Sequence, residues 1–84
     1  MDVRNNDDMQ RFEAELEGNF AVLEYKKSGH QLYLIHTEVP EQFEGQGIGG
    51  KLVRAAYAYA REHKLNPVPR CPFVARYLEK HPDL

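Results

Sequence analysis

The stretch that decides the fold is Glu44-Gly45-Gln46-Gly47-Ile48-Gly49-Gly50-Lys51, in which four glycines fall within six residues. An apolar, β-rich segment ends just before this stretch, and the pattern of an amphipathic helix begins inside it. Glycine permits positive φ angles and lets a ligand approach the main chain closely. The free N–H groups at the start of a helix attract anions, and the helix dipole adds to this attraction. The stretch therefore predicts either a glycine-rich turn between strand and helix or a loop that holds phosphate groups.

Three segments with strand-like patterns precede the glycine stretch. In residues 11–17 apolar side chains alternate with charged ones, which is the period of a half-buried strand. Residues 20–25 and 30–39 follow as a second and a third strand, and the short turns between the three predict an antiparallel meander. Alternation on the third strand predicts one face made of four residues: Leu32, Leu34, His36 and Glu38.

The pattern after the glycine stretch predicts a helix, a short strand and a second helix. Apolar residues recur at spacings of three and four, which indicates an amphipathic helix of about four turns that starts near Ile48 and stops before Pro67. Residues 68–70 return to the sheet beside the third strand, and such a crossover makes the two strands parallel. Cys71-Pro72 then opens the last helix, because proline suits the first helical position. The order β-β-β-α-β-α predicts an α+β (α/β) fold with a mixed sheet.

Composition limits the classes of protein that the chain can represent. We expect one domain over residues 10–84 and a flexible tail over residues 1–9, which are polar. The net charge of −2 argues against nucleic acid as the main partner. The single cysteine, Cys71, excludes an intramolecular disulfide, and neither it nor the histidine spacing indicates a metal site. No apolar run approaches the ~20 residues that span a bilayer, and no signal-peptide core is present, so we expect a cytoplasmic location and no membrane partner.

Two further segments make the interpretation of the glycine stretch more specific. His36-Thr37-Glu38-Val39-Pro40 lies before it, and Cys71-Pro72-Phe73-Val74 lies after it. The run from Gly45 to Gly49 resembles the acetyl-CoA signature of the GNAT superfamily of N-acetyltransferases, Gln/Arg-x-x-Gly-x-Gly/Ala between a strand and a helix. The three segments in this order resemble the small, single-domain members of the NATD1 type. The resemblance covers about residues 11–82.

This resemblance implies an acetyl-CoA-dependent N-acetyltransferase with a minimal GNAT-like fold. It implies that the third strand and residues 68–70 splay apart, so that the pantetheine arm of coenzyme A lies between them. The implied cofactor-binding residues are Val39, Gly45, Gln46, Gly47, Ile48, Gly49, Gly50 and Lys51, whose backbone N–H groups in the loop hold the pyrophosphate. Lys51 either adds a positive charge there or is a solvated helix residue. Glu44 stands where the signature has Gln or Arg, and its negative charge would weaken the binding of an anion.

Acetyl transfer to an amine also requires catalytic groups, for which the sequence offers three candidates. A lysine-like amine has a pKa near ~10.4 and must lose a proton before it attacks, so His36 or Glu38 is a candidate proton acceptor. Cys71 at a helix N-terminus is a candidate for a lowered thiol pKa and a covalent acetyl intermediate. The structural alternatives are a core histidine, a surface carboxylate and a small buried hydrophobe. Tyr77 could stabilise the departing thiolate or an oxyanion, or simply belong to the core.

Three functions remain open at this stage. The first is the acetyltransferase with an amine acceptor of unknown identity. The second is a non-catalytic module that binds CoA or acyl-CoA, and the third is a binder of another phosphorylated ligand. The chain lacks the N-terminal helical segment that builds much of the acceptor site in larger members of the superfamily. We therefore expect an open acceptor site, which points to a macromolecular acceptor or to a partner that completes the site; the oligomeric state is left open.

Overall fold

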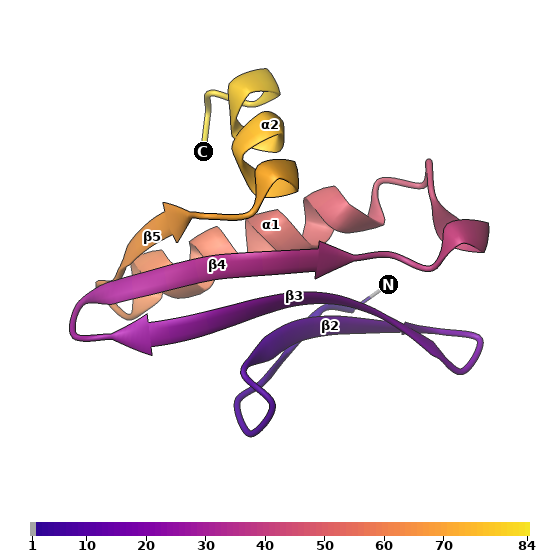
Figure 1. Ribbon diagram of the computed structural model, residues 1–84, viewed down its shortest axis with the longest axis horizontal. Coiled ribbons are helices and arrows are strands. Elements are labelled where there is room, and N and C mark those ends of the chain that lie inside the picture. The colour runs from indigo at the N-terminus through magenta and orange to yellow at the C-terminus, as the bar shows by residue number, and fades with distance from the viewer. Residues whose placement is uncertain (1) are drawn as a thin grey trace.

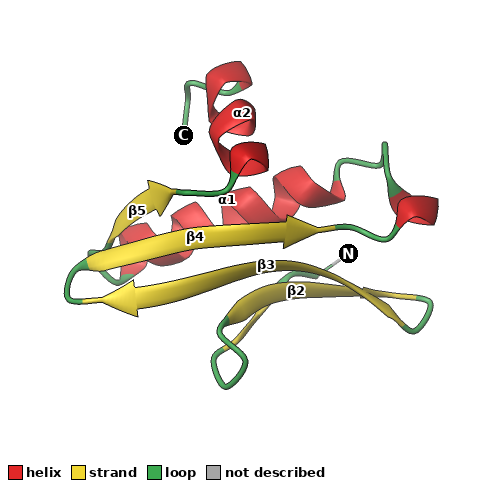
Figure 2. Ribbon diagram, viewed as in Figure 1, coloured by secondary structure: helices red, strands yellow, loops and turns green. Residues whose placement is uncertain are grey.

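The computed structural model describes residues 2–84 and shows a mixed five-stranded sheet with helices on one face (Figures 1 and 2). The elements follow the chain as β1 (Arg4–Asn6), β2 (Arg11–Leu16), β3 (Asn19–Ser28), β4 (Gln31–Glu38), the 3-10 helix η1 (Glu41–Phe43), α1 (Ile48–Glu62), β5 (Asn66–Pro69) and α2 (Pro72–Lys80). The strands lie in sequence order, with β1 to β4 antiparallel and β5 parallel to β4. The predicted α+β fold, with its antiparallel meander and parallel β-α-β crossover, is confirmed.

The core lies between the sheet and α1. The predicted apolar stripe of α1 packs against the sheet through Leu52, Ala56 and Ala60, which are fully buried. The spacing of three and four residues also includes His63, but His63 is the C-terminal cap residue and is exposed. Among residues 2–84, no helix combines the length and the apolar character that crossing a membrane requires.

The N-terminal segment differs from the predicted flexible tail over residues 1–9. Arg4–Asn6 form the edge strand β1, which pairs with β2. Two polar contacts attach the segment: the Tyr25 hydroxyl bonds to the side-chain oxygens of Asn5 (2.6 Å) and Asp7 (3.0 Å). The prediction was wrong because it counted apolar side chains, whereas this strand is held by backbone pairing and polar side chains. Met1 lies outside the described residues.

The pairing of β3 with β4 contains a one-residue bulge that changes which side chains face the helices. Glu24 pairs with His36 and Tyr25 pairs with Leu34, so Ile35 is an extra residue on β4. Before the bulge Leu32 and Leu34 are fully buried on the helix side. After it the alternation is inverted, because Thr37 is now paired with buried Leu23 and turns toward the helices.

The bulge overturns the prediction that His36 and Glu38 share a face with Leu32 and Leu34. The side chains of His36 and Glu38 are 56% and 71% exposed, and they lie on the sheet face opposite α1. A strict two-residue alternation cannot reveal an inserted residue, and a shift of one position moves every later side chain to the other face. This inversion determines which residues of β4 can reach each face of the sheet.

Glu13 of β2 is a buried carboxylate, only 1% exposed, although it lies on the face opposite α1. Arg11 (2.8 Å), Asn6 (3.1 Å) and Arg4 (3.0–3.1 Å) donate hydrogen bonds to its two oxygens. Burial alone would raise the pKa of Glu13, but these hydrogen bonds and the charge of Arg11 outweigh it and lower the pKa below its ordinary value. The carboxylate therefore fastens β1 to β2.

We expect the substitution Glu13→Gln to reduce the free energy of unfolding by about 2 kcal/mol at pH 7, because hydrogen bonds to a charged group are lost. A group whose folded pKa is lowered stabilises the fold above its unfolded pKa, near ~4.3 for glutamate, and loses that contribution as the pH falls through the folded pKa. The difference between wild type and variant should therefore shrink below about pH 4. Urea unfolding at pH 7 and pH 3.5 measures this difference in the free energy of unfolding. The control is Glu15→Gln, at an exposed position of the same strand. Equal destabilisation at both pH values would contradict the assignment.

Candidate functional site

The β4 and β5 strands are paired only over the first half of β4. Their register runs from Gln31 opposite Asn66 to Leu34 opposite Pro69. The Cys71 N–H then donates to the Leu34 carbonyl (2.9 Å), and the chain turns away into α2. The second half of β4, which begins with the bulge at Ile35, therefore has no strand on this side. The position of the bulge coincides with the point where the sheet opens.

A pocket of about 770 Å³ lies on the helix side of this opening. In Figure 1 the glycine loop and α2 flank the C-terminal end of β4. Its lining comes from the end of β4, the loop, the first turns of α1 and one face of α2: Thr37, Val39, Phe43, Glu44, Gly45, Gly47, Ile48, Gly49, Gly50, Lys51, Arg54, Phe73, Tyr77 and His81. Of the predicted cofactor-binding residues only Gln46 does not line it.

The loop leaves the N-terminus of α1 open toward the pocket. Gly45 (φ 85°) and Gly47 (φ 76°) adopt the left-handed conformation that favours glycine, and Gly47 is the N-terminal cap residue. The first intrahelical hydrogen bond runs from the Lys51 N–H to the Gly47 carbonyl (3.2 Å). The N–H groups of residues 48–50 therefore precede the first intrahelical donor and have no acceptor within residues 2–84. These donors at the positive end of the helix dipole can hold an anion.

Gly49 and Gly50 have a different role from the two glycines before them. A Cβ atom on Gly49 would lie 2.5 Å from the Phe73 ring, and one on Gly50 would lie 2.6 Å from the Tyr77 ring. The first turn of α1 is therefore glycine-rich because the aromatic face of α2 lies directly against it. The glycine stretch predicted close approach of a ligand to the main chain, whereas at Gly49 and Gly50 the close neighbours are the rings of α2.

Two cations and one acid accompany the free N–H groups. Lys51 and Arg54 line the pocket from α1, and Glu44 lines it from the loop. Arg54 donates to the Tyr77 hydroxyl (2.9 Å) and pairs with Asp83 (3.4 Å), so it links α1 to the C-terminal segment. The first turn of α1 contains no acidic residue that would compete with an anion for the helix dipole. The positive groups outnumber Glu44, and the pocket fits an anionic ligand.

Cys71 lies at the apex of the opening, beside the pocket rather than in its lining. Cys71 is the N-terminal cap residue of α2 and is 5% exposed, and its Sγ lies 3.4 Å from the Thr37 Oγ1. Burial would raise the pKa of the thiol, but hydrogen bonds from the Thr37 hydroxyl and from the N–H groups of Val74 and Phe73 outweigh it and lower the pKa. Thr37, which itself lines the pocket, separates the thiol from the open space.

The structure brings two of the three catalytic candidates together and leaves the third apart. His36 Nε2 lies 3.5 Å from Glu38 Oε1 on the face opposite α1, whereas Cys71 is on the helix side. All three lie near the point where β4 and β5 separate. His36 and Glu38 follow the bulge on β4, and the Cys71 N–H donates to the carbonyl of Leu34, just before it. Among residues 2–84, no group of three His, Cys, Asp or Glu side chains could hold a metal ion.

Sequence reasoning missed part of the pocket. The bulge hid Thr37, and Arg54 looked like an ordinary solvated helix residue. Phe73, Tyr77 and His81 were recognisable, because their four-residue spacing places them on one face of a helix. The structure shows them as a ladder of rings, with centroids 6.4 Å apart for Phe73 and Tyr77 and 4.1 Å apart for Tyr77 and His81.

A family model and individual relatives indicate the same family for this chain. A family model described as "GCN5-related N-acetyl-transferase" matches residues 11–84. The chain is 34% identical over 85 residues to Protein NATD1 of Mus musculus, which covers 95% of this chain and 77% of the relative. It is 32% identical to Protein NATD1 of Xenopus tropicalis (95% of this chain, 76% of the relative). It is 33% identical to Protein NATD1 of Homo sapiens (87% of this chain, 67% of the relative).

The contact between Gly49 and Phe73 predicts a coupled pair of substitutions. We expect Gly49→Ala to lower the free energy of unfolding by about 1 kcal/mol, because the added methyl group forces the Phe73 ring aside. In a Phe73→Ala background the same change should be neutral or stabilising, since alanine is the better helix former. A double-mutant cycle measured by chemical denaturation gives the coupling energy between the two substitutions. An unchanged cost in the Phe73→Ala background would show that the ring is not the obstacle.

Proposed function

The chain belongs to the GCN5-related N-acetyltransferase family, and we propose that it transfers an acetyl group from acetyl-CoA to an amine acceptor. The observation that carries this proposal is the pocket itself. It contains the free N–H groups at the N-terminus of α1 and the part of β4 that has no partner on its β5 side. An anion-binding site and a strand edge therefore share one cavity. A ligand with a pyrophosphate at one end and an extended, amide-containing arm suits both parts.

Each part of acetyl-CoA has a candidate partner in this arrangement. The pyrophosphate is placed at the N–H groups of residues 48–50, with Lys51 and Arg54 adding positive charge. The pantetheine arm is placed along Thr37 and Val39, where β4 has no strand on its β5 side. This placement leads the thioester toward the bulge. Glu44 is the one charge in the lining that opposes the phosphates.

The chemistry requires an amine without its proton, near the thioester. His36 and Glu38 lie beside the bulge on the sheet face opposite α1, and either can take the proton from the acceptor's ammonium group, directly or through water. The amine nitrogen then attacks the thioester carbon. A C–N bond forms and the C–S bond breaks. The nitrogen gives up a second proton as the amide forms, and the departing thiolate accepts a proton to become free CoA. We propose this direct attack as the principal route.

A two-step route through Cys71 is a variant of this proposal. The lowered pKa of the Cys71 thiol favours the thiolate that would attack the thioester, release CoA and hold the acetyl group as a new thioester. The amine would then attack this acetyl-Cys71 and return the thiol. The burial of Cys71 behind Thr37 weighs against this route, because the thiol must first become accessible.

The alternative function is a non-catalytic module that binds CoA or acyl-CoA. The exposure of His36 and Glu38 favours it, because a general base is usually held in a desolvated, well-positioned site. Under this alternative the pocket would still bind the nucleotide, but no amine would be acetylated. Binding and turnover therefore have to be measured separately.

The charge of Glu44 predicts a directional effect on binding. We expect acetyl-CoA to raise the melting temperature of the protein, with about 2.7 kcal/mol of stabilisation at a ligand concentration of ~100 times the Kd. Glu44→Gln should tighten binding severalfold at low salt and less at 0.5 M salt, because it removes a negative charge from the lining. Glu41→Gln is the matched control, since Glu41 is exposed three residues earlier and does not line the pocket. If neither CoA nor acetyl-CoA shifted the melting temperature, both the enzyme and the binding module would be excluded.

The catalytic assignment predicts a loss of rate without a loss of binding. With a panel of amines as acceptors, we expect His36→Gln to slow CoA release by at least about 100-fold while the Kd for acetyl-CoA stays unchanged, as for removal of a general base. His30→Gln, an exposed turn histidine, should have the wild-type rate. Direct attack also predicts no acetyl adduct on the protein by intact-mass analysis at short times. A hydroxylamine-labile adduct that Cys71→Ala removes would establish the two-step route instead.

A further inference from the structure

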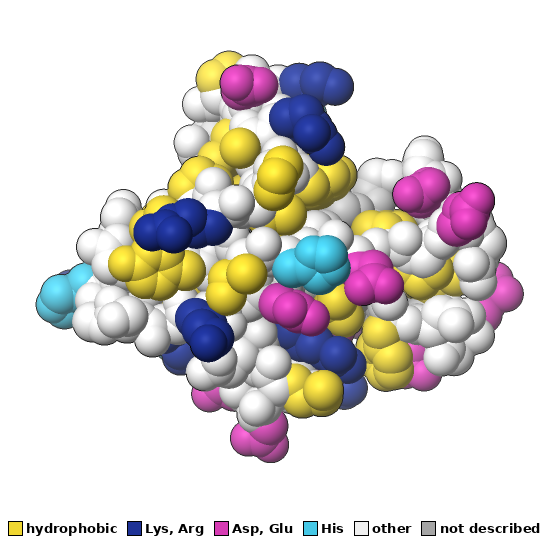
Figure 3. Space-filling view, in the orientation of Figure 1, with side chains coloured by type: hydrophobic (Ala, Val, Ile, Leu, Met, Phe, Trp, Pro, Cys, Tyr) yellow, Lys and Arg dark blue, Asp and Glu magenta, His cyan; other side chains and the backbone are white. Residues whose placement is uncertain are grey.

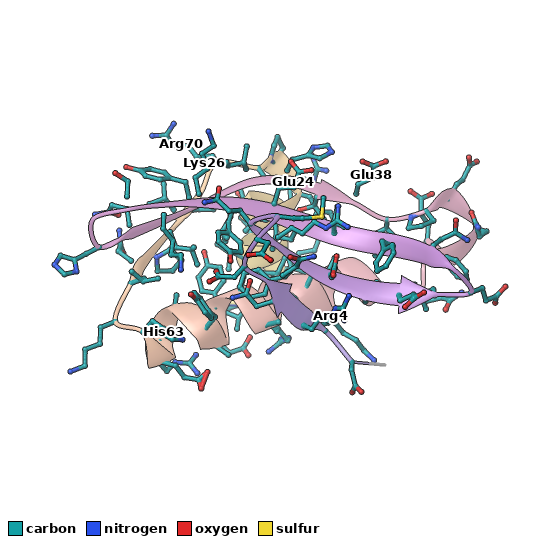
Figure 4. The ribbon with its side chains drawn as sticks, turned by 90° about the horizontal axis from the view of Figure 1, so that it is seen from below. Arg4, Glu24, Lys26, Glu38, His63 and Arg70 are labelled. Atoms are coloured by element: carbon teal, nitrogen blue, oxygen red, sulfur yellow. The ribbon has the colours of Figure 1, made fainter. Side chains whose placement is uncertain are left out.

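The sheet face opposite α1 is buried at Glu13 of β2 but exposed along β3 and β4, at Glu24, Lys26, His36 and Glu38. Figure 4 shows Arg70, Lys26, Glu24 and Glu38 along this side of the sheet, while His63 of α1 is on the other side. Register and exposure place three groups in order along β3 and β4: a basic end, an exposed apolar residue and an acidic end. We refer to this strip as the open face.

The basic end of the open face consists of Lys26 and Arg70 around Tyr33. Lys26 pairs across the strands with Tyr33, and the Arg70 guanidinium lies over the Tyr33 ring, 5.1 Å from its centroid. Neither cation has a carboxylate within 4.0 Å among residues 2–84. Lys26 of β3 and Arg70, which follows β5, therefore lie beside Tyr33 without a carboxylate partner and can bind an anion.

The acidic end consists of Glu24 and Glu38 on either side of His36. Glu24 is the cross-strand partner of His36, and Glu38 Oε1 lies 3.5 Å from His36 Nε2. Glu24 has no cation within 4.0 Å among residues 2–84. In Figure 3, which looks onto this face, a histidine lies between acidic side chains, with basic side chains directly below them and further basic side chains beside apolar ones to its left. Arg11, the cross-strand partner of Glu24 on β2, is paired with Glu13.

The two ends have a fixed separation. Tyr33 and His36 are three residues apart on β4, which corresponds to roughly 10 Å at the rise of an extended strand. Ile35, 41% exposed, lies between them. A peptide extended in the polyproline II conformation has three residues per turn and a rise of about 3.1 Å per residue, so two side chains three residues apart lie on the same side of it, about 9 Å apart, and could reach both ends. Opposite charges on the protein and on that peptide would then face each other.

We propose that the open face is the docking surface for a protein acceptor, bound as an extended segment with its lysine at Glu24, His36 and Glu38. An acidic side chain about three residues from that lysine meets Lys26 and Arg70. This inference rests on the proposed acetyl transfer and adds the identity of the acceptor: a lysine with a nearby acid, on a protein chain. The open face fits a peptide better than a small amine, because small ligands bind in concave sites and this surface is a strand face with Ile35 exposed.

The test compares peptide acceptors that differ only in charge. One pair of peptides carries lysine with glutamate three residues before or after it, and the matched pair carries glutamine in place of glutamate. We expect kcat/KM for CoA release to be about fivefold higher with one of the glutamate peptides at low salt. The same peptide should bind more tightly by fluorescence anisotropy in the absence of acetyl-CoA, which makes the docking surface testable without turnover.

The second part of the test changes the charges on the protein. Arg70→Glu should remove the preference for the glutamate peptide, and Lys26→Gln should reduce it, while binding of acetyl-CoA stays unchanged. Lys80→Glu is the control, because it makes the same reversal at an exposed position of α2. A melting temperature equal to that of the wild type would show that each variant keeps the fold.

The outcomes separate this inference from the proposed function. Acetylation of all four peptides at equal rates, or of free lysine as fast as the best peptide, would overturn the docking surface and leave the acetyltransferase intact. Self-association that buries Tyr33 and Ile35, detected by analytical ultracentrifugation, would also overturn it. Charge-selective peptide binding without CoA release from acetyl-CoA would instead support the docking surface and refute the transfer.

Discussion

The extra residue at Ile35 is the constraint on which the rest of the site depends. Without it, β4 would continue its alternation, and His36 would lie on the helix side in place of Thr37. The bulge also falls where the pairing of β4 with β5 ends at Leu34 and Pro69. One inserted residue therefore does two things. It interrupts the regular pairing of β4 with β3 at the position where the sheet opens, and it directs the Thr37 hydroxyl toward the pocket and the His36 imidazole toward the open face.

The glycine stretch serves both the backbone conformation and the packing of α2. Gly45 and Gly47 adopt positive φ angles that let the loop turn into α1 with its first N–H groups free. Gly49 and Gly50 have no side chains, which leaves room for Phe73 and Tyr77 to pack against the helix. The aromatic face of α2 thus forms one wall of the pocket and the helix N-terminus forms another. The Arg54 contacts with Tyr77 and Asp83 connect these walls.

The sequence was sufficient for the fold because its main signals are local. The turns, the amphipathic helix and the strand–helix–strand crossover each follow from a few neighbouring residues, and the glycine stretch correctly located the loop at the pocket. The errors arose where the cause was not local. Arg4–Asn6 form a strand because Glu13, Tyr25 and Asp7 fix them, and His36 changes face because of an insertion that only the register with β3 defines. Neither fact is visible in the composition or the period of the segment itself.

The two faces of β4 bear on the choice between the direct and the two-step route. Cys71 lies beside Thr37 on the helix side, while His36 and Glu38 lie on the open face. In direct attack the thioester comes to the bulge from one face and the amine from the other, so a single base on the open face is enough. In the two-step route an acetyl group held on Cys71 would have to return from behind Thr37 to reach an amine across the strand. The lowered pKa of the thiol favours the reactive thiolate of Cys71, but the position of His36 and Glu38, the proposed bases, favours the proposed direct transfer.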